Sequence, residues 1–171
     1  ASSGSATPKE TTSVVADWKF SKEYVKSGSI ENGNMVIEDA SQNGNDLELV
    51  TVGDSSSPEL KNILTWSEDD YDGQENIDSL QFANYKKAPS GRYLKTTNDA
   101  PINSKTFEHG FTIEAIFKLP SHFNSSLHSW MGILTRQGQA ADLNKTEGEK
   151  EILTTLSVSS DQEIQWTSHP S

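Results

Sequence analysis

Apolar and polar residues alternate along most of this chain in short runs, which is the pattern of strands with one buried face. The clearest run is residues 111–119, "FTIEAIFKL". Its apolar face is predicted to be Phe111, Ile113, Ala115, Phe117 and Leu119. Residues 47–52 alternate in the same way. Further strands are predicted at 14–20, 35–39, 62–66, 79–85, 92–97, 130–138, 152–160 and 163–168. No segment has a convincing amphipathic helical period, so the pattern predicts an all-β antiparallel sandwich.

The first residues carry no such pattern. Residues 1–13 are rich in Ser and Thr and are expected to be a disordered leader, either a mature N-terminus after signal cleavage or a remnant of an expression tag. Residues 14–171 are expected to form one domain, which is long enough to bury a core. The chain has no cysteine, which excludes disulfides and thiolate metal sites.

The net negative charge of the chain argues against two classes of binding partner. The net charge is −11, from 14 basic and 25 acidic residues. Nucleic acids and anionic membranes require a positive surface, so neither is an expected partner. No apolar run approaches the length of a membrane span, and membrane insertion is not expected.

Residue patterns for catalysis are missing from the sequence. A retaining glycosidase needs two carboxylates about 5–5.5 Å apart, which on a strand requires alternating acids. The run 111–119 has a single acid, Glu114. There is no G-x-S-x-G elbow, no H-E-x-x-H motif and no phosphate-binding glycine loop. The chain is therefore not expected to be an enzyme.

A polar loop before the strand at 47–52 is a candidate cation site. Its hard oxygen donors are Asp39, Asn43, Asn45 and Asp46, around a turn at Gly44. Calcium prefers six to eight such oxygens, so a structural Ca²⁺ ion is one hypothesis. Asn and Asp also favour turns by capping their own backbone, and a turn without a metal is the alternative.

Aromatic residues outside the clean strand patterns are candidate ligand platforms, because a sugar stacks its apolar face on an exposed ring. These candidates are Trp66, Tyr71, Tyr85 and Trp130. The aromatics on apolar strand faces are predicted to be core: Trp18, Phe82, Phe111 and Phe117.

Four stretches together resemble a family. They are "VVADWKF", "DASQNGNDLEL", "SLQFANYKKAPSGRYLKT" and "FTIEAIFKL…MGILTRQG". In this order they resemble the laminin-G-like and concanavalin A-like lectin/glucanase jelly rolls of bacterial type, with Gln42 where glycine is usual. The resemblance implies a jelly roll, a frequent structural calcium ion, and a second half that would begin where this chain stops. It therefore implies missing final strands, supplied by a C-terminal half or covered by an adjoining domain.

The sequence thus predicts a secreted or cell-surface module that recognises a glycan, matrix or cell-wall ligand without catalysis. An alternative is a structural accessory domain packed on a neighbouring hydrolase domain, such as a metallophosphoesterase. A third, less favoured, is a glucanase-like glycoside hydrolase.

Overall fold

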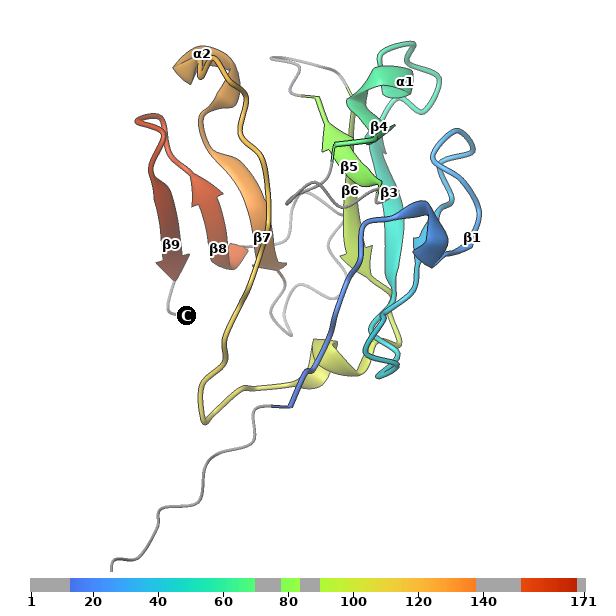
Figure 1. Cartoon of the computed structure of the whole chain (residues 1–171), viewed down its shortest axis with the longest axis vertical. Helices are drawn as coiled ribbons and strands as arrows, with labels where there is room; N and C mark the ends of the chain where they lie inside the picture. Colours follow the sequence, from blue (N-terminus) through green and yellow to red (C-terminus); the bar gives the residue numbers. More distant parts are fainter. Residues whose placement is uncertain (1–12, 70–77, 84–89, 138–151, 169–171) are drawn as a thin grey trace, which may run out of the picture.

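The computed structural model describes residues 13–69, 78–83, 90–137 and 152–168 (Figure 1). These residues form an all-β fold, with antiparallel sheets and few helical residues. Its elements are η1 (Lys22–Tyr24), β1 (Val25–Ser27), β2 (Val36–Ile37), β3 (Leu47–Gly53), α1 (Leu60–Ile63), β4 (Leu64–Ser67), β5 (Ser79–Phe82), β6 (Ser90–Thr96), η2 (Pro101–Ser104), α2 (Ser125–His128), β7 (Met131–Gln137), β8 (Ile152–Val158) and β9 (Ile164–Ser168). Among the described residues, no helix is long and apolar enough to cross a membrane.

The largest sheet has four strands in the order β1-β2-β3-β6. Strands β3 and β6 pair over seven residues, from Leu47 opposite Thr96 to Gly53 opposite Ser90. Leu47 and Leu49 are buried, as the alternation in this segment predicts.

The core lies between this sheet and the hairpin formed by β4 and β5. Its buried members are Ile30, Met35, Ile37, Leu47, Leu49 and Leu64. Partly buried apolar side chains pack around them: Trp18, Tyr24, Val25, Trp66, Leu80 and Leu94. The hairpin therefore covers the apolar face of the four-stranded sheet, which gives a sandwich-like arrangement.

A second sheet has the order β7-β8-β9 and is separated from the first in Figure 1. The turn between β8 and β9 is closed by Ser159, whose Oγ accepts the N–H groups of Asp161 and Glu163, both at 3.2 Å. Val158 is its one buried apolar residue among those whose burial is described, and Ile164 and Trp166 are 51% and 46% exposed. This sheet is therefore much less covered than the first.

Residues 111–119 do not form the predicted strand. They are unpaired, and Phe111, Ile116 and Phe117 are 56%, 58% and 43% exposed. In Figure 1 the segment runs as a trace between η2 and α2. The prediction that this face lines the core is wrong, because no described strand pairs with the segment and its apolar side chains stay largely exposed.

Two smaller expectations are also corrected. Residues 14–20 form only an isolated bridge, between Trp18 and Asp39, and not a strand. Phe82, predicted to be core, is 53% exposed. It is the last residue of β5, where its partner in the ladder is the first residue of β4, Leu64, so the hairpin end leaves its ring uncovered.

Candidate functional site

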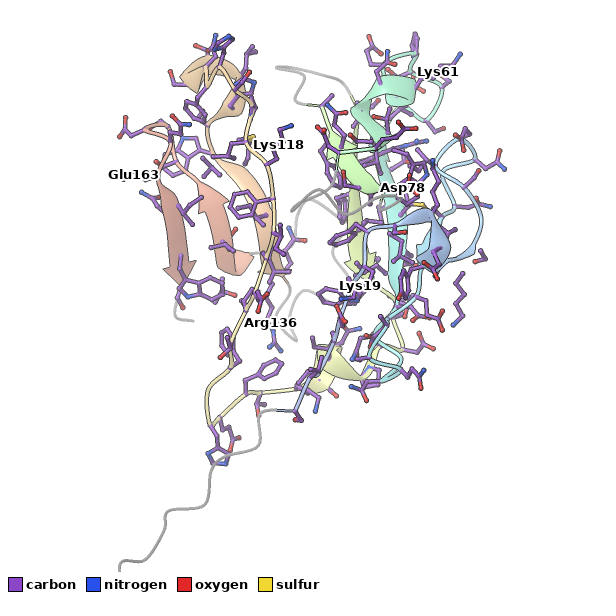
Figure 2. All side chains as sticks on the ribbon, viewed as in Figure 1. Lys19, Lys61, Asp78, Lys118, Arg136 and Glu163 are labelled. Atoms are coloured by element: carbon purple, nitrogen blue, oxygen red, sulfur yellow. The ribbon has the colours of Figure 1, made fainter. Side chains whose placement is uncertain are left out.

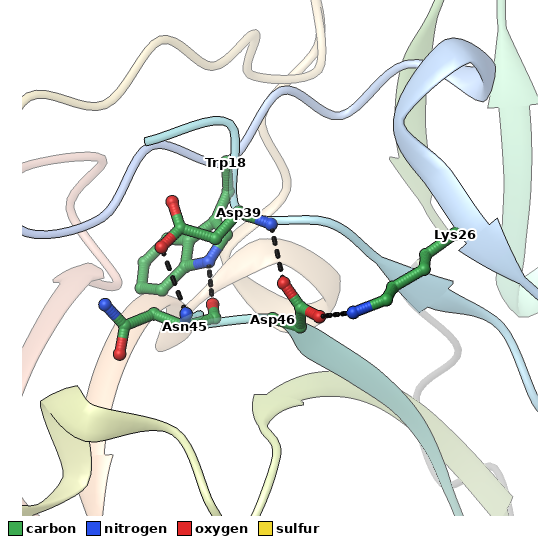
Figure 3. Close-up of polar contacts among 5 residues, drawn as sticks. All are labelled: Trp18, Lys26, Asp39, Asn45 and Asp46. Carbon is green, nitrogen blue, oxygen red and sulfur yellow. Dashed lines mark hydrogen bonds and ion pairs between the residues drawn. The ribbon is translucent and has the colours of Figure 1, made fainter. Parts of the chain in front are cut away.

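Asp39 is the hydrogen-bonding centre of the loop that was predicted to hold a cation. Its side chain is 1% exposed. Oδ1 accepts the N–H groups of Asp17 and Ser41 at 2.9 and 3.0 Å and the Ser41 hydroxyl at 2.6 Å. Oδ2 accepts the N–H of Asn45 at 3.0 Å (Figure 3). Burial would raise the pKa of Asp39, but these donors outweigh it and hold the pKa below its ordinary value.

Asn45 joins three distant parts of the chain. Its amide nitrogen donates to the carbonyl of Val15 at 2.8 Å, and its Oδ1 accepts the N–H of Ile102 at 2.7 Å. Its backbone carbonyl accepts the indole N–H of Trp18 at 2.6 Å (Figure 3). The side chain is fully buried, so the loop is a structural junction as well as a turn.

Asp46 is already paired with a cation. Its Oδ2 lies 2.6 Å from the Lys26 ammonium, and its Oδ1 accepts the Asp39 N–H at 2.9 Å (Figure 3). Burial opposes the ionisation of Asp46, but the Lys26 hydrogen bond and the Asp39 N–H hold its pKa below the ordinary value. Asp46 in turn raises the pKa of Lys26. The Asn43 side chain points its amide nitrogen at the carbonyls of Val14 and Val15, at 2.9 and 3.1 Å.

Each carboxylate oxygen of Asp39 and Asp46 thus has a protein donor. Among the described residues, no group of three or more His, Asp or Glu side chains is arranged to hold a metal ion. Calcium binding at this loop stays a prediction, and the ion would have to replace the Lys26 ammonium at Asp46.

A calcium titration tests this. We expect added calcium to raise the melting temperature by a few degrees and EDTA to reverse the change, because an ion that binds only the folded state stabilises it. Lys26→Met should enlarge the shift by freeing Asp46 Oδ2, and Asp46→Ala should abolish it. Equal shifts in all three proteins would place the ion elsewhere. No shift in the parent or in Lys26→Met would exclude the loop as a calcium site.

The predicted ligand platforms do not come together. Trp66, in β4, is partly buried against the core. Trp130 is 66% exposed and precedes β7, at the end of the second sheet where β8 turns into β9. Tyr71 and Tyr85 lie outside the described residues. Of the two candidates within the described residues, Trp130 has the exposure that a stacking platform needs.

A different set of aromatic rings lies side by side. The ring centroids of Phe107 and Phe111 are 5.5 Å apart, and those of Phe111 and Trp166 are 6.0 Å apart. The rings are tilted by 57° in both pairs, as in favourable aromatic contacts. We call Phe107, Phe111 and Trp166 the aromatic row. Because Phe111 and Trp166 are about half exposed, the row offers apolar ring surface to a ligand.

A shallow hollow of about 420 Å³ begins at one end of the row. It is lined by Val15 and by residues 104–110, which include Phe107 of the row. The turn that shapes it is closed by the Gly110 N–H, which donates to the Phe107 carbonyl at 3.0 Å. Gly110 has φ +90°, which a side chain would strain.

Polar groups border this hollow. The Lys105 ammonium and the His109 ring have no hydrogen-bond or ionic partner among the described residues, and both side chains are exposed. The backbone carbonyl of Lys105 accepts from Arg136 of β7 at 2.9 Å, which fixes the hollow against the second sheet. Figure 2 shows Arg136 near the lower part of the segment that follows η2. Exposed hydrogen-bond donors beside exposed rings are the elements of a carbohydrate site.

The sequence pattern did not predict the aromatic row. Phe111 sits in an alternating run and was assigned to the core, and Phe107 lies in a polar turn. Trp166 occupies an alternating position of β9, and the pattern does not show that its ring is 46% exposed. No local signal in the sequence brings residues 107 and 166 together, since the contact is tertiary.

Comparisons with protein-family models, with curated proteins and with solved structures find no match to this chain. The resemblance to laminin-G-like domains therefore stays a prediction.

Proposed function

We propose that this chain is a non-catalytic extracellular module that recognises a neutral glycan through the aromatic row and the adjoining hollow. The observation that carries the proposal is the continuity of three rings, two of them about half exposed, with a hollow that is lined by the exposed polar residues Lys105 and His109. The four stretches that resemble lectin-like jelly rolls support the same reading.

Both ring stacking and hydrogen bonds would contribute to the binding of the sugar. Pyranose rings present C–H groups on one face, which pack on Phe111 and Trp166. The hydroxyl groups at the ring edge can bond to Lys105 and His109, whose side chains are exposed beside the rings. The net charge of −11 disfavours sulfated or uronic glycans, so neutral sugars are the expected class.

Affinity gel electrophoresis with β-glucan, xylan and mannan tests the proposal, with heparin as the anionic comparison. We expect retardation by at least one neutral polysaccharide and none by heparin. Trp166→Ala and Phe111→Ala should each weaken binding about tenfold or more, because a central aromatic contact typically contributes that much.

The matched control is Phe82→Ala, which removes a ring that is also half exposed but lies in β5. It should bind as the parent does. Trp130→Ala is measured beside it, since Trp130 is a platform predicted from sequence and is 66% exposed. Loss of binding in Trp130→Ala alone would move the site to that end of β7. Absence of retardation by every neutral polysaccharide would contradict the proposal.

A further inference from the structure

Residues 113–119 have the alternating chemistry of a strand, but none of the described strands pairs with them. No backbone N–H or C=O of this segment bonds to a described residue. Ile113, Ile116 and Phe117 are 37%, 58% and 43% exposed. A segment of alternating apolar residues with free backbone groups is a template for pairing with another strand.

The charges of the segment indicate which strand fits. It carries one acid, Glu114, and one base, Lys118, four residues apart on the same face. When two copies of the segment pair antiparallel about a two-fold axis at Ile116, each Glu114 faces a Lys118 of the other copy. The opposite pairs are then Ile113 with Leu119, Glu114 with Lys118, Ala115 with Phe117, and Ile116 with its own copy. Opposite charges in directly opposed positions stabilise a sheet.

Other registers lose this match. A shift by one residue puts the apolar face of one copy beside the mixed face of the other. An axis at Ala115 keeps the faces but places Glu114 opposite Ile116, and an axis at Phe117 places Lys118 opposite Ile116. The axis at Ile116 is therefore the register that pairs both charges and both faces.

The present contacts of Glu114 and Lys118 allow both side chains to pair with a second copy. Within the described part of the chain, Glu114 has no hydrogen bond or ionic partner. Lys118 pairs with Asp69 at 2.8 Å, with side chains 78% and 66% exposed. Figure 2 shows Lys118 on the segment that leads to α2. An exposed ion pair contributes little to stability, so Lys118 can change partner at little cost.

We propose that two copies of this chain associate by antiparallel pairing of residues 113–119, with Ile116 on the two-fold axis. The contact is isologous, so it closes at a dimer. It goes beyond the proposed glycan site, because it leaves Phe107, Phe111 and Trp166 outside the paired residues.

Cysteine cross-linking tests the register. The chain has no native cysteine, so any disulfide formed must involve the introduced residue. Ile116→Cys places two thiols opposite each other at a Cα separation of about 4.5–5.5 Å, which a disulfide spans. Mild oxidation should give a covalent dimer of twice the 18.8 kDa chain mass. Thr112→Cys is the matched control, since its two copies would lie about 26 Å apart. Equal cross-linking of both variants would overturn the register.

Charge reversal tests the pairing itself by sedimentation equilibrium in about 0.15 M salt, which screens the repulsion between the acidic copies. Glu114→Lys and Lys118→Glu should each weaken self-association about tenfold or more, because like charges then oppose each other twice. An equimolar mixture of the two variants restores both opposite-charge pairs and should dimerise like the parent. Asp69→Asn removes the present partner of Lys118 and should not weaken the dimer. A monomeric parent at about 0.1 mM, or a mixture that associates no better than its components, would overturn the proposal.

Discussion

Replacing Asp39 with alanine is expected to lower the free energy of unfolding by about 3 kcal/mol, because it leaves buried N–H groups without an acceptor. The carboxylate is 1% exposed and accepts hydrogen bonds from Asp17, Ser41 and Asn45. Urea unfolding followed by circular dichroism measures the loss. Asp39→Asn keeps the shape but not the charge, and should cost less than the alanine variant.

Asp54→Ala is the control for this change. Asp54 accepts the N–H and the hydroxyl of Ser56 at 2.9 and 2.6 Å, which repeats the local geometry of Asp39 with Ser41 on an exposed loop. Its removal should change stability by less than about 0.5 kcal/mol. Similar losses for Asp39→Ala and Asp54→Ala would show that burial of the Asp39 loop has no special effect.

The pH dependence of stability follows from the same carboxylates. The folded pKa values of Asp39 and Asp46 lie below the ordinary value of 3.8. Their contribution is therefore fully present above pH 3.8 and is lost as the pH falls through the folded values. The urea midpoint should decline below about pH 4, and Asp39→Asn should make that decline shallower.

Ile37→Ala is expected to cost about 2–5 kcal/mol, because it removes a fully buried side chain and leaves a cavity. Ile37 lies in β2 and is 0% exposed in the cluster between the four-stranded sheet and the β4–β5 hairpin. Ile164→Ala makes the same chemical change in β9, where the side chain is 51% exposed. It should cost less than about 1 kcal/mol, and denaturant unfolding compares the two. Comparable losses would mean that the second sheet is covered as fully as the first.

Periodicity predicted strands in both sheets, among them β3 in the first and β7, β8 and β9 in the second. Leu47 and Leu49 alternate with partly exposed neighbours in β3, and the pattern is right because the hairpin packs on that face. The strands predicted at 152–160 and 163–168 are β8 and β9, and local bonds to Ser159 close the turn between them. These features depend on residues close in sequence or on one continuous face.

The failures concern contacts that no local pattern encodes. Residues 111–119 have the best alternation in the chain, yet alternation reports only that one face is apolar and not that another layer covers it. β1 was missed because Val25–Ser27 is only three residues long and two of them are polar, which is too short for an alternating pattern. The oxygen-rich loop was located from its composition, but its donors, Asp17, Lys26 and Ile102, come from distant segments.

The hydrogen bonds of Asn45 also limit how early the N-terminal part of the chain can finish folding during synthesis. Its side-chain oxygen accepts from the N–H of Ile102, which is 57 residues further along the chain. While the ribosome is still making the intervening residues, the Asn45 side-chain oxygen has no Ile102 N–H to accept from, and the loop cannot complete its hydrogen bonds. The N-terminal part of the chain therefore reaches its final form only after residue 102 has left the exit tunnel.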